Sequence, residues 1–172
     1  MFKKILVPYD GSKPADKATR YAMDLAKAIS RNSYADDDVA GCEIILLHVV
    51  PEIPASPVFI ERPMSTSKGE HIPLSEYVRR LYAEMKVHAA EMLEKKKKEI
   101  ETFLENRGTT VRTVVIIGDP VANKIVEQAA SENVDLIVIG NVGLSGVSKL
   151  KTLGSVSRGV SERAPCPVMI VH

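Results

Sequence analysis

Five short apolar stretches recur along this chain, and helical patterns or polar loops separate each from the next. The stretches begin at Lys3, Glu43, Arg112, Val134 and Cys166, and their β-branched residues follow one another without polar alternation. Such runs are typical of strands buried on both faces, as in a parallel sheet. Strands that alternate with helices predict an α/β fold. Right-handed crossovers then favour a doubly wound, five-stranded, mainly parallel sheet with helices on both faces.

Four helices are expected between these strands. The first begins after Ser12, its N-cap, and the second runs from about residue 74 to residue 106. The third follows Asp119, an expected cap, with Pro120 at the first helical position, and the fourth ends before Pro165. In the second helix, the apolar stripe facing the sheet is expected to consist of Leu81, Met85, His88, Met92, Ile100 and Phe103.

Three polar segments interrupt this pattern. Residues 51–73 are rich in proline and serine, so we expect a long surface loop inserted in a single domain that spans residues 1–172. Such a loop is either a mobile linker or a lid over a site. The acidic triplet 36–38 and the lysine run 95–98 are expected to be solvated, the latter as one face of the second helix.

Charge and composition exclude several classes of protein. With 23 basic and 22 acidic residues the net charge is +1, so no long-range field favours nucleic acid or an anionic membrane. Cys42 and Cys166 lie far apart without metal-ligand spacing, which speaks against a disulfide framework and a zinc site, and both are expected to be buried. No signal-peptide region or membrane-length apolar run is found, so the chain is expected to be cytoplasmic.

A glycine-rich segment follows the fourth apolar stretch and leads into the fourth expected helix. Gly140, Gly143 and Gly154 lie in it, and Ser155 follows directly. The amides of a glycine-rich turn and the unpaired amides at a helix start both favour an anion such as a phosphate chain. The segment has no Walker A spacing, and no GxGxxG motif follows the first strand. From the residues alone it is either a phosphate-binding loop or a mobile connector.

Nearly the whole chain resembles the universal stress protein family, whose members are α/β proteins that bind adenine nucleotides. The matching segments, in the right order, are KKILVPYDGS, LLHVV, GDP, the glycine-rich segment and the closing GSVSRGVSERAPCPVMIVH. Ten residues separate Gly143 from Gly154, one more than in the family's G-x2-G-x9-G-[S/T] motif. The resemblance implies a Rossmann-like fold of the adenine nucleotide alpha hydrolase type.

The same resemblance implies a nucleotide site at the carboxyl ends of the strands. Asp10 would bind the ribose or adenine side, Pro8 would shape its turn, and Val49 would pack on the base. From the residues alone, Asp10 could equally make an Asx turn and Val49 could be ordinary core, while His48 is expected to be a satisfied core histidine. The phosphates would lie against Gly140, Gly143, Gly154, Ser155 and the amide of Val156.

The function implied is a regulatory module that binds ATP together with Mg²⁺ or Mn²⁺ and forms a homodimer. The terminal strand would pair with its twin, because an apolar edge strand leaves unpaired backbone groups. Two other functions stay open. One is a weak ATPase or a phosphotransfer protein modified at Ser145, Ser148 or Ser155, although only fragments of a phosphoryl-transfer site are found. The other is a nucleotide-free dimer that acts as an interaction or chaperone-like protein.

Overall fold

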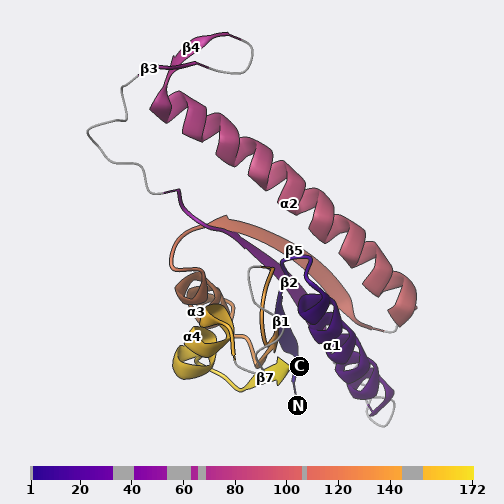
Figure 1. Cartoon of the computed structure of the whole chain (residues 1–172). Coiled ribbons are helices and arrows are strands. Elements are labelled where there is room, and N and C mark those ends of the chain that lie inside the picture. Colours follow the sequence, from indigo (N-terminus) through magenta and orange to yellow (C-terminus); the bar gives the residue numbers. More distant parts are fainter. Residues whose placement is uncertain (1, 33–40, 54–62, 66–68, 106–107, 145–152) are drawn as a thin grey trace.

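The apolar stretches form a single parallel sheet in the computed structural model, which describes residues 2–32, 41–53, 63–65, 69–105, 108–144 and 153–172 (Figure 1). Its strands are β1 (Lys4–Pro8), β2 (Glu43–Val50), β5 (Thr110–Ile117), β6 (Leu136–Gly140) and β7 (Val168–Val171). They pair in the order β5-β2-β1-β6-β7, and each pairing is parallel. The predicted five-stranded sheet is confirmed. Because the order reverses between β1 and β6, a crevice is expected at the carboxyl ends of these strands.

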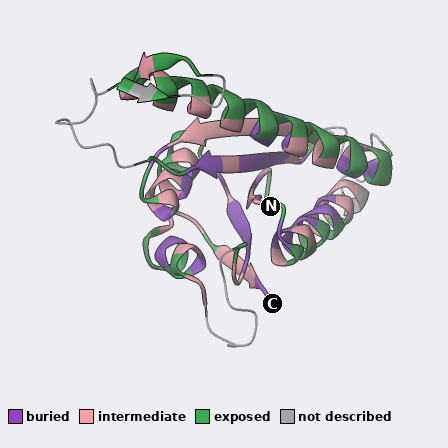
Figure 2. Ribbon diagram, turned by 45° about the horizontal axis from the view of Figure 1, so that its top comes forward, coloured by how far each residue is buried: buried purple, intermediate pink, exposed green. Residues whose placement is uncertain are grey.

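Helices cover both faces of the sheet, as predicted. One face carries α1 (Lys13–Asn32) and α2 (Leu74–Leu104), and the other carries α3 (Val121–Ser131) and α4 (Ser155–Arg163). Side chains of β1 alternate between the two cores: Ile5 and Val7 pack on the α1 and α2 side, whereas Leu6 packs on the α3 and α4 side. The central strands β1, β2 and β6 are therefore buried from both sides and mostly purple in Figure 2, whereas the edge strands β5 and β7 are mostly half-buried and pink.

The sequence predicts the start of α1 correctly and misplaces the start of α3 by one residue. The hydroxyl of Ser12 accepts a hydrogen bond from the Ala15 amide at 3.2 Å, so Ser12 is the N-cap of α1, as predicted. The prediction for α3 is wrong by one residue. Pro120 is itself the N-cap, joined to Asp119 by a cis peptide bond, and Val121 is the first helical residue. No side chain caps this helix.

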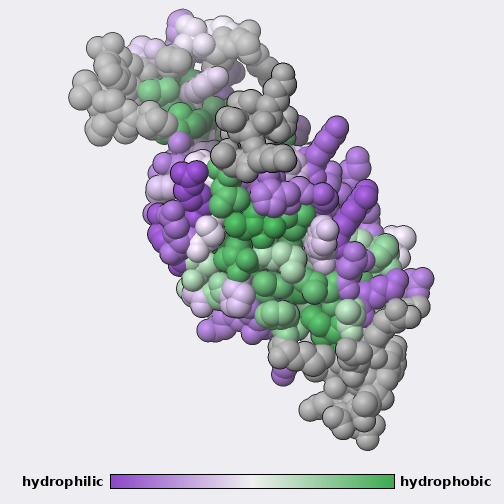
Figure 3. All heavy atoms as spheres, turned by 60° about the horizontal axis from the view of Figure 1, so that its bottom comes forward, coloured by the Kyte–Doolittle hydropathy of each residue, from purple (hydrophilic) through white to green (hydrophobic). Residues whose placement is uncertain are grey.

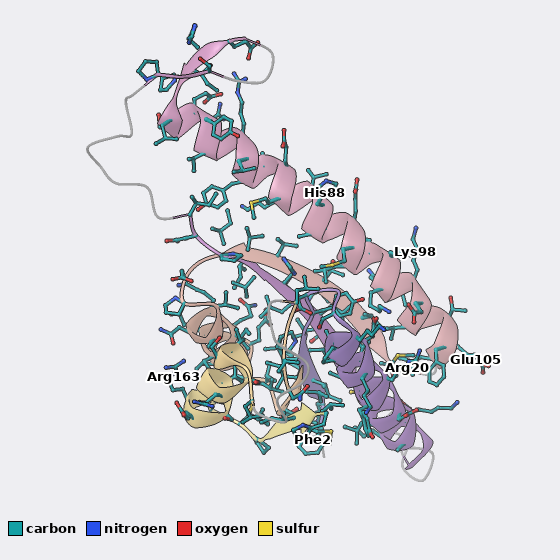
Figure 4. The ribbon with its side chains drawn as sticks, viewed as in Figure 1. Phe2, Arg20, His88, Lys98, Glu105 and Arg163 are labelled. Carbon is teal, nitrogen blue, oxygen red and sulfur yellow. The ribbon has the colours of Figure 1, made fainter. Side chains whose placement is uncertain are left out.

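The predicted apolar stripe of α2 is displaced around the helix from the residues that are in fact buried. His88 and Phe103 are exposed, and the buried residues lie beside the predicted positions (Figure 4 shows His88 pointing away from the sheet). The Phe103 ring instead lies under the Lys27 ammonium, 4.9 Å from the ring centroid. Among the predicted residues only Ile100 is fully buried. The residues of α2 that reach the core are Ala89, Leu93, Ile100 and Leu104.

The N-terminal part of α2 extends past the sheet and carries a small hairpin (Figure 1). Strands β3 (Pro63–Ser65) and β4 (His71–Pro73) pair antiparallel there. The prediction of a long surface loop over residues 51–73 is therefore wrong for these two strands. Residues 54–62 and 66–68 lie outside the described residues, as does the acidic triplet 36–38.

Both cysteines are free thiols, but only one is in the core. Cys42 is buried as predicted, whereas Cys166 is half-buried just before β7, so the prediction for Cys166 is wrong.

Among the described residues, no helix combines the length and the apolar character that crossing a bilayer needs.

Candidate functional site

A cavity of about 600 Å³ lies at the carboxyl ends of β1, β2 and β6, where the strand order reverses. Ligand sites in proteins fall in this size range and at this place in open α/β sheets. The eight residues that the sequence predicts for a nucleotide site all line this cavity: Pro8, Asp10, Val49, Gly140, Gly143, Gly154, Ser155 and Val156.

Asp10 joins the first strand to the glycine-rich segment. Its carboxylate accepts the Ser12 amide at 3.0 Å, which makes the Asx turn considered above. The other carboxylate oxygen accepts the Leu144 amide at 3.1 Å. Asp10 is the one carboxylate among the described residues that line the cavity. It therefore fixes both the start of α1 and the start of the glycine-rich segment.

Two glycines of this segment are required by packing. A Cβ on Gly143 would lie 2.6 Å from the Asp10 carboxylate, and a Cβ on Gly140 would lie 2.7 Å from Cβ of Pro14 in α1. Both distances are far below van der Waals contact. Any side chain at these positions would displace α1 or Asp10. Residues 145–152, which include Ser145 and Ser148, lie outside the described residues.

The start of α4 closes the end of the cavity that the glycine-rich segment forms. Gly154 is the N-cap, and no side chain of the described residues caps the helix, so its first-turn amides are placed to bind a ligand. The Asn141 carbonyl accepts the Gly154 amide at 2.8 Å and the Ser157 hydroxyl at 2.6 Å. Ser155 is exposed toward the cavity mouth. The sequence analysis missed Ser157, which is 2% exposed and ties α4 back to β6.

The opposite wall of the cavity is apolar. Val49 is 8% exposed, and Pro51, Val121 and Ile125 continue the wall from β2 to α3. His48 lies beside them, half-buried, with Nδ1 2.8 Å from the Tyr9 carbonyl. Because a carbonyl only accepts, Nδ1 carries the proton. The prediction of a satisfied core histidine is confirmed for its hydrogen bond and wrong for its place, because His48 is only half-buried and lines the cavity.

A part-buried polar network next to the cavity was missed by the sequence analysis. The Tyr9 hydroxyl donates to the Asp16 carboxylate at 2.8 Å, and the Lys96 ammonium of α2 lies 2.8 Å from the same carboxylate. Lys96 also lies 5.5 Å from the Tyr9 ring centroid. The Lys96 side chain is only 13% exposed, so the prediction that the whole lysine run is solvated is wrong at this position.

The network sets the protonation of its members. Burial and then the bond to Asp16 raise the pKa of Tyr9 to about 12, so the phenol stays a donor at neutral pH. Burial alone would raise the pKa of Asp16, but the hydrogen bonds from Lys96 and Tyr9 outweigh burial and lower it. Burial likewise opposes the charge of Lys96, and its bonds to Asp16 and Glu99 nevertheless raise its pKa.

The cavity thus has two chemically different ends. One end, built from β2 and α3, is apolar and suits a flat aromatic group. The other end, built from the glycine-rich segment and the start of α4, presents backbone amides and suits an anion. A second depression, of about 220 Å³, is lined by Lys13, Asp16, Lys17 and Arg20 of α1 and holds none of the predicted site residues.

Comparison with known proteins supports the resemblance seen in the sequence. The model of the universal stress protein family matches residues 1–172. The universal stress protein MJ0531 of Methanocaldococcus jannaschii is 32% identical over 171 residues, which are 99% of this chain and 82% of that protein. The universal stress protein YxiE of Bacillus subtilis is 31% identical over 172 residues, which are 100% of both chains.

Solved structures share the fold. The universal stress protein UspA from Lactobacillus plantarum superposes with a TM-score of 0.75 at 21% identity, covering 99% of this chain and 98% of that one. The protein MJ0577, solved as a test case for assigning biochemical function from structure, superposes with a TM-score of 0.64 at 26% identity, covering 99% and 96%. With its family match over the whole length, its relatives above 30% identity and this shared fold, the chain belongs to the universal stress protein family.

Proposed function

We propose that this protein binds an adenine nucleotide, ATP by preference, and acts as a regulatory module whose shape depends on occupancy. The observation that carries the proposal is the cavity at the reversal of strand order, with an apolar wall at one end and backbone amides at the other. A nucleotide has the same polarity, because its base is flat and weakly polar and its phosphates are anionic. Each end of the cavity matches one end of such a ligand.

Different residues of the cavity would bind different parts of the nucleotide. Val49 and its apolar neighbours would pack on the adenine, and Asp10 would accept a hydrogen bond from the ribose. The amides of the glycine-rich segment and of Ser155 and Val156 would bind the phosphates. Mg²⁺ or Mn²⁺ bound with a triphosphate prefers oxygen ligands, mostly from the phosphates and water, and Asp10 and Ser155 are the lining groups that fit such an ion.

Relatives with bound nucleotides support the choice of ligand class. A universal stress protein has been solved in complex with cAMP, and the Archaeoglobus fulgidus family member has been solved in complex with dAMP. Their identities to this chain are 23% and 16%, and their TM-scores are 0.54 and 0.55. At these identities the likeness shows the fold, so the proposal depends on the cavity.

The test uses calorimetric titration of nucleotide-stripped protein with Mg-ATP and, separately, with adenosine. The Ser155→Glu variant adds a negative charge where the phosphates would lie, while an acidic residue in the first turn of a helix favours folding. We expect ATP affinity to fall by about tenfold or more, and adenosine affinity to stay within about twofold.

The matched control is Ser161→Glu, which adds the same charge to the same helix but outside the cavity-lining residues. It should leave ATP affinity unchanged. The proposal is wrong if the wild-type protein binds neither ligand, or if Ser155→Glu and Ser161→Glu weaken ATP binding equally.

A homodimer formed through β7 is the second part of the proposal. β7 is an edge strand, and Val168, Met169 and Ile170 are only half-buried. Figure 3 views the molecule from the lower side of Figure 1, where β7 lies, and hydrophobic residues gather on this face. The Pro167 carbonyl accepts the amide of Ile137 in β6, and the Val171 carbonyl accepts the amide of Asn141, the residue that follows β6. The alternating amides of Val168 and Ile170 therefore face the free edge.

Ile170→Pro tests this interface by removing an outward amide. The bonds that Pro167 and Val171 make to β6 remain, since proline is tolerated on an edge strand. Ile170→Ala is the control, because it loses the same side chain and keeps the amide. By analytical ultracentrifugation we expect wild type and Ile170→Ala to sediment as dimers and Ile170→Pro as a monomer. A dimeric Ile170→Pro protein would assign the contact elsewhere.

A further inference from the structure

The turn between β1 and α1 is held from the side opposite the cavity as well as from the cavity itself. Tyr9 is 7% exposed and precedes Asp10 directly. Its ring belongs to the core under α1 and α2, while its amide donates to the Leu47 carbonyl at 2.8 Å and its carbonyl contacts His48. The packed ring and these two backbone contacts together hold the backbone that carries Asp10.

Helix α2 reaches this turn without lining the cavity. None of its described residues is among the lining residues. Met92 packs against the same core, and a Cβ on Gly11 would lie 3.2 Å from its sulfur. One turn later Lys96 lies 2.8 Å from the Asp16 carboxylate, which also accepts the Tyr9 hydroxyl. The centre of α2 thus contacts the turn at Gly11 and at Tyr9.

Lys96 differs from its neighbours in the lysine run. It lies 2.7 Å from the Glu99 carboxylate as well as 2.8 Å from that of Asp16, and its ammonium lies above the Tyr9 ring. Lys95 and Lys98 of the same helix are exposed, and Figure 4 shows Lys98 pointing away from the sheet. An ion that is largely removed from water keeps a defined geometry only with its partners in place. Removing the ammonium takes away the cation that is hydrogen-bonded to the Asp16 carboxylate and leaves it with the Tyr9 hydroxyl and the electrostatic influence of Arg20.

We infer that Lys96 is a positioning residue of the nucleotide site: by holding Asp16 and Tyr9 it fixes the turn 9–12 and, with it, the carboxylate of Asp10. The inference rests on the proposed function, since it concerns the affinity of the same cavity. It assigns to α2, which does not line the cavity, an influence on binding that acts through Asp16 and Tyr9. The affinity for the nucleotide therefore depends on where α2 lies against the sheet.

A purely structural role for Lys96 makes a different prediction. If the ion pair only attaches α2 to α1, its loss lowers the free energy of unfolding and leaves the folded site intact. If the pair positions Asp10, its loss also weakens binding by the protein that remains folded. The two roles separate when affinity and stability are measured on the same variants.

The experiment compares Lys96→Met with Lys98→Met, the same substitution at an exposed position of the same helix. Lys96→Arg restores the charge and serves as the rescue variant. Mg-ATP affinity is measured by calorimetry and stability by urea unfolding. The ¹H–¹⁵N amide spectra of the ligand-free proteins report the turn through Gly11 and Ser12, and the Asp10 contact through Leu144.

We expect Lys96→Met to bind Mg-ATP about tenfold more weakly than wild type, with the amide signals of Gly11, Ser12 and Leu144 displaced. Lys98→Met should match wild type in affinity and in these signals, and Lys96→Arg should recover most of the affinity. Unchanged affinity and unchanged amide signals in a folded Lys96→Met protein would overturn the inference, whatever the loss of stability.

Failure of the proposed function has a different signature. In that case the wild-type protein itself binds no nucleotide, and calorimetry shows no heat of binding for any variant. The amide spectra of the ligand-free proteins then still decide whether Lys96 fixes the turn 9–12, and an undisturbed turn in Lys96→Met would overturn the inference independently.

Discussion

Replacing Gly143 by alanine tests how the glycine-rich segment is joined to the first strand. The backbone of Gly143 does not adopt a positive φ, so among the described residues the obstacle to a Cβ is the Asp10 carboxylate, 2.6 Å away. Contact at about 3.5 Å requires the carboxylate to move by about 0.9 Å. The bond from the Leu144 amide, already 3.1 Å long, would then be lost.

The loss has a predictable size. Hydrogen bonds to charged groups contribute about 1.5 to 3 kcal/mol, and solvent access at Leu144, which is 74% exposed, reduces this to about 1 kcal/mol. We expect Gly143→Ala to lower the free energy of unfolding by that amount in urea titrations. Because Asp10 is also displaced from its place in the cavity, Mg-ATP affinity should fall by about tenfold in calorimetry.

A double-mutant cycle with Asp10→Ala isolates this mechanism. Without the carboxylate, Gly143→Ala has nothing to displace, so its cost in stability and in affinity should fall nearly to zero. The reasoning is refuted if Gly143→Ala leaves the wild-type protein unchanged, or if it has the same effect in both backgrounds.

Three further changes have definite expected outcomes. Gly140→Ala places a Cβ 2.8 Å from the Pro14 backbone, which cannot yield as a side chain would, so urea unfolding should show a loss of about 2 to 3 kcal/mol; a wild-type midpoint would contradict the packing argument. Ser157→Ala removes the 2.6 Å bond to the Asn141 carbonyl and should cost about 1 kcal/mol, less if the Gly154 amide compensates. The pKa of Asp16 is lowered from 3.8 on folding, so its contribution to stability is complete above that pH and is lost as the pH falls through the folded pKa. The unfolding free energy of Asp16→Asn should therefore decline less steeply than that of wild type between about pH 4 and 2, and parallel curves would contradict the assignment.

Features encoded by local pattern were predicted correctly from the sequence. The five strands are uninterrupted apolar runs, and the alternation of strands and helices leaves few possible topologies. The glycine-rich segment and Asp10 then meet because parallel strands end at the same edge of the sheet. The sequence explains the glycines as room for a ligand, whereas the structure shows that Gly140 and Gly143 also have no room for a side chain.

The errors arise where distant segments decide the outcome. The helix α2 has apolar residues on more than one side, so its sequence leaves open which stripe packs on the sheet. Lys96 looks like its neighbours in a run of four lysines, and only the fold brings Tyr9 and Asp16 to it. The hairpin of β3 and β4 lies in a segment whose prolines favour a loop, and Pro63 and Pro73 stand at its outer ends.

The most direct test of the account is a ¹H–¹⁵N titration of the nucleotide-stripped wild-type protein with Mg-ATP. The account predicts that saturable shifts gather on both walls of the cavity, at Val49 on one side and at Gly143, Gly154 and Ser155 on the other. Amides of Lys17 and Arg20, which line the separate depression on α1, should stay unperturbed. Shifts confined to that depression, or none at all, would contradict nucleotide binding at the carboxyl ends of the strands.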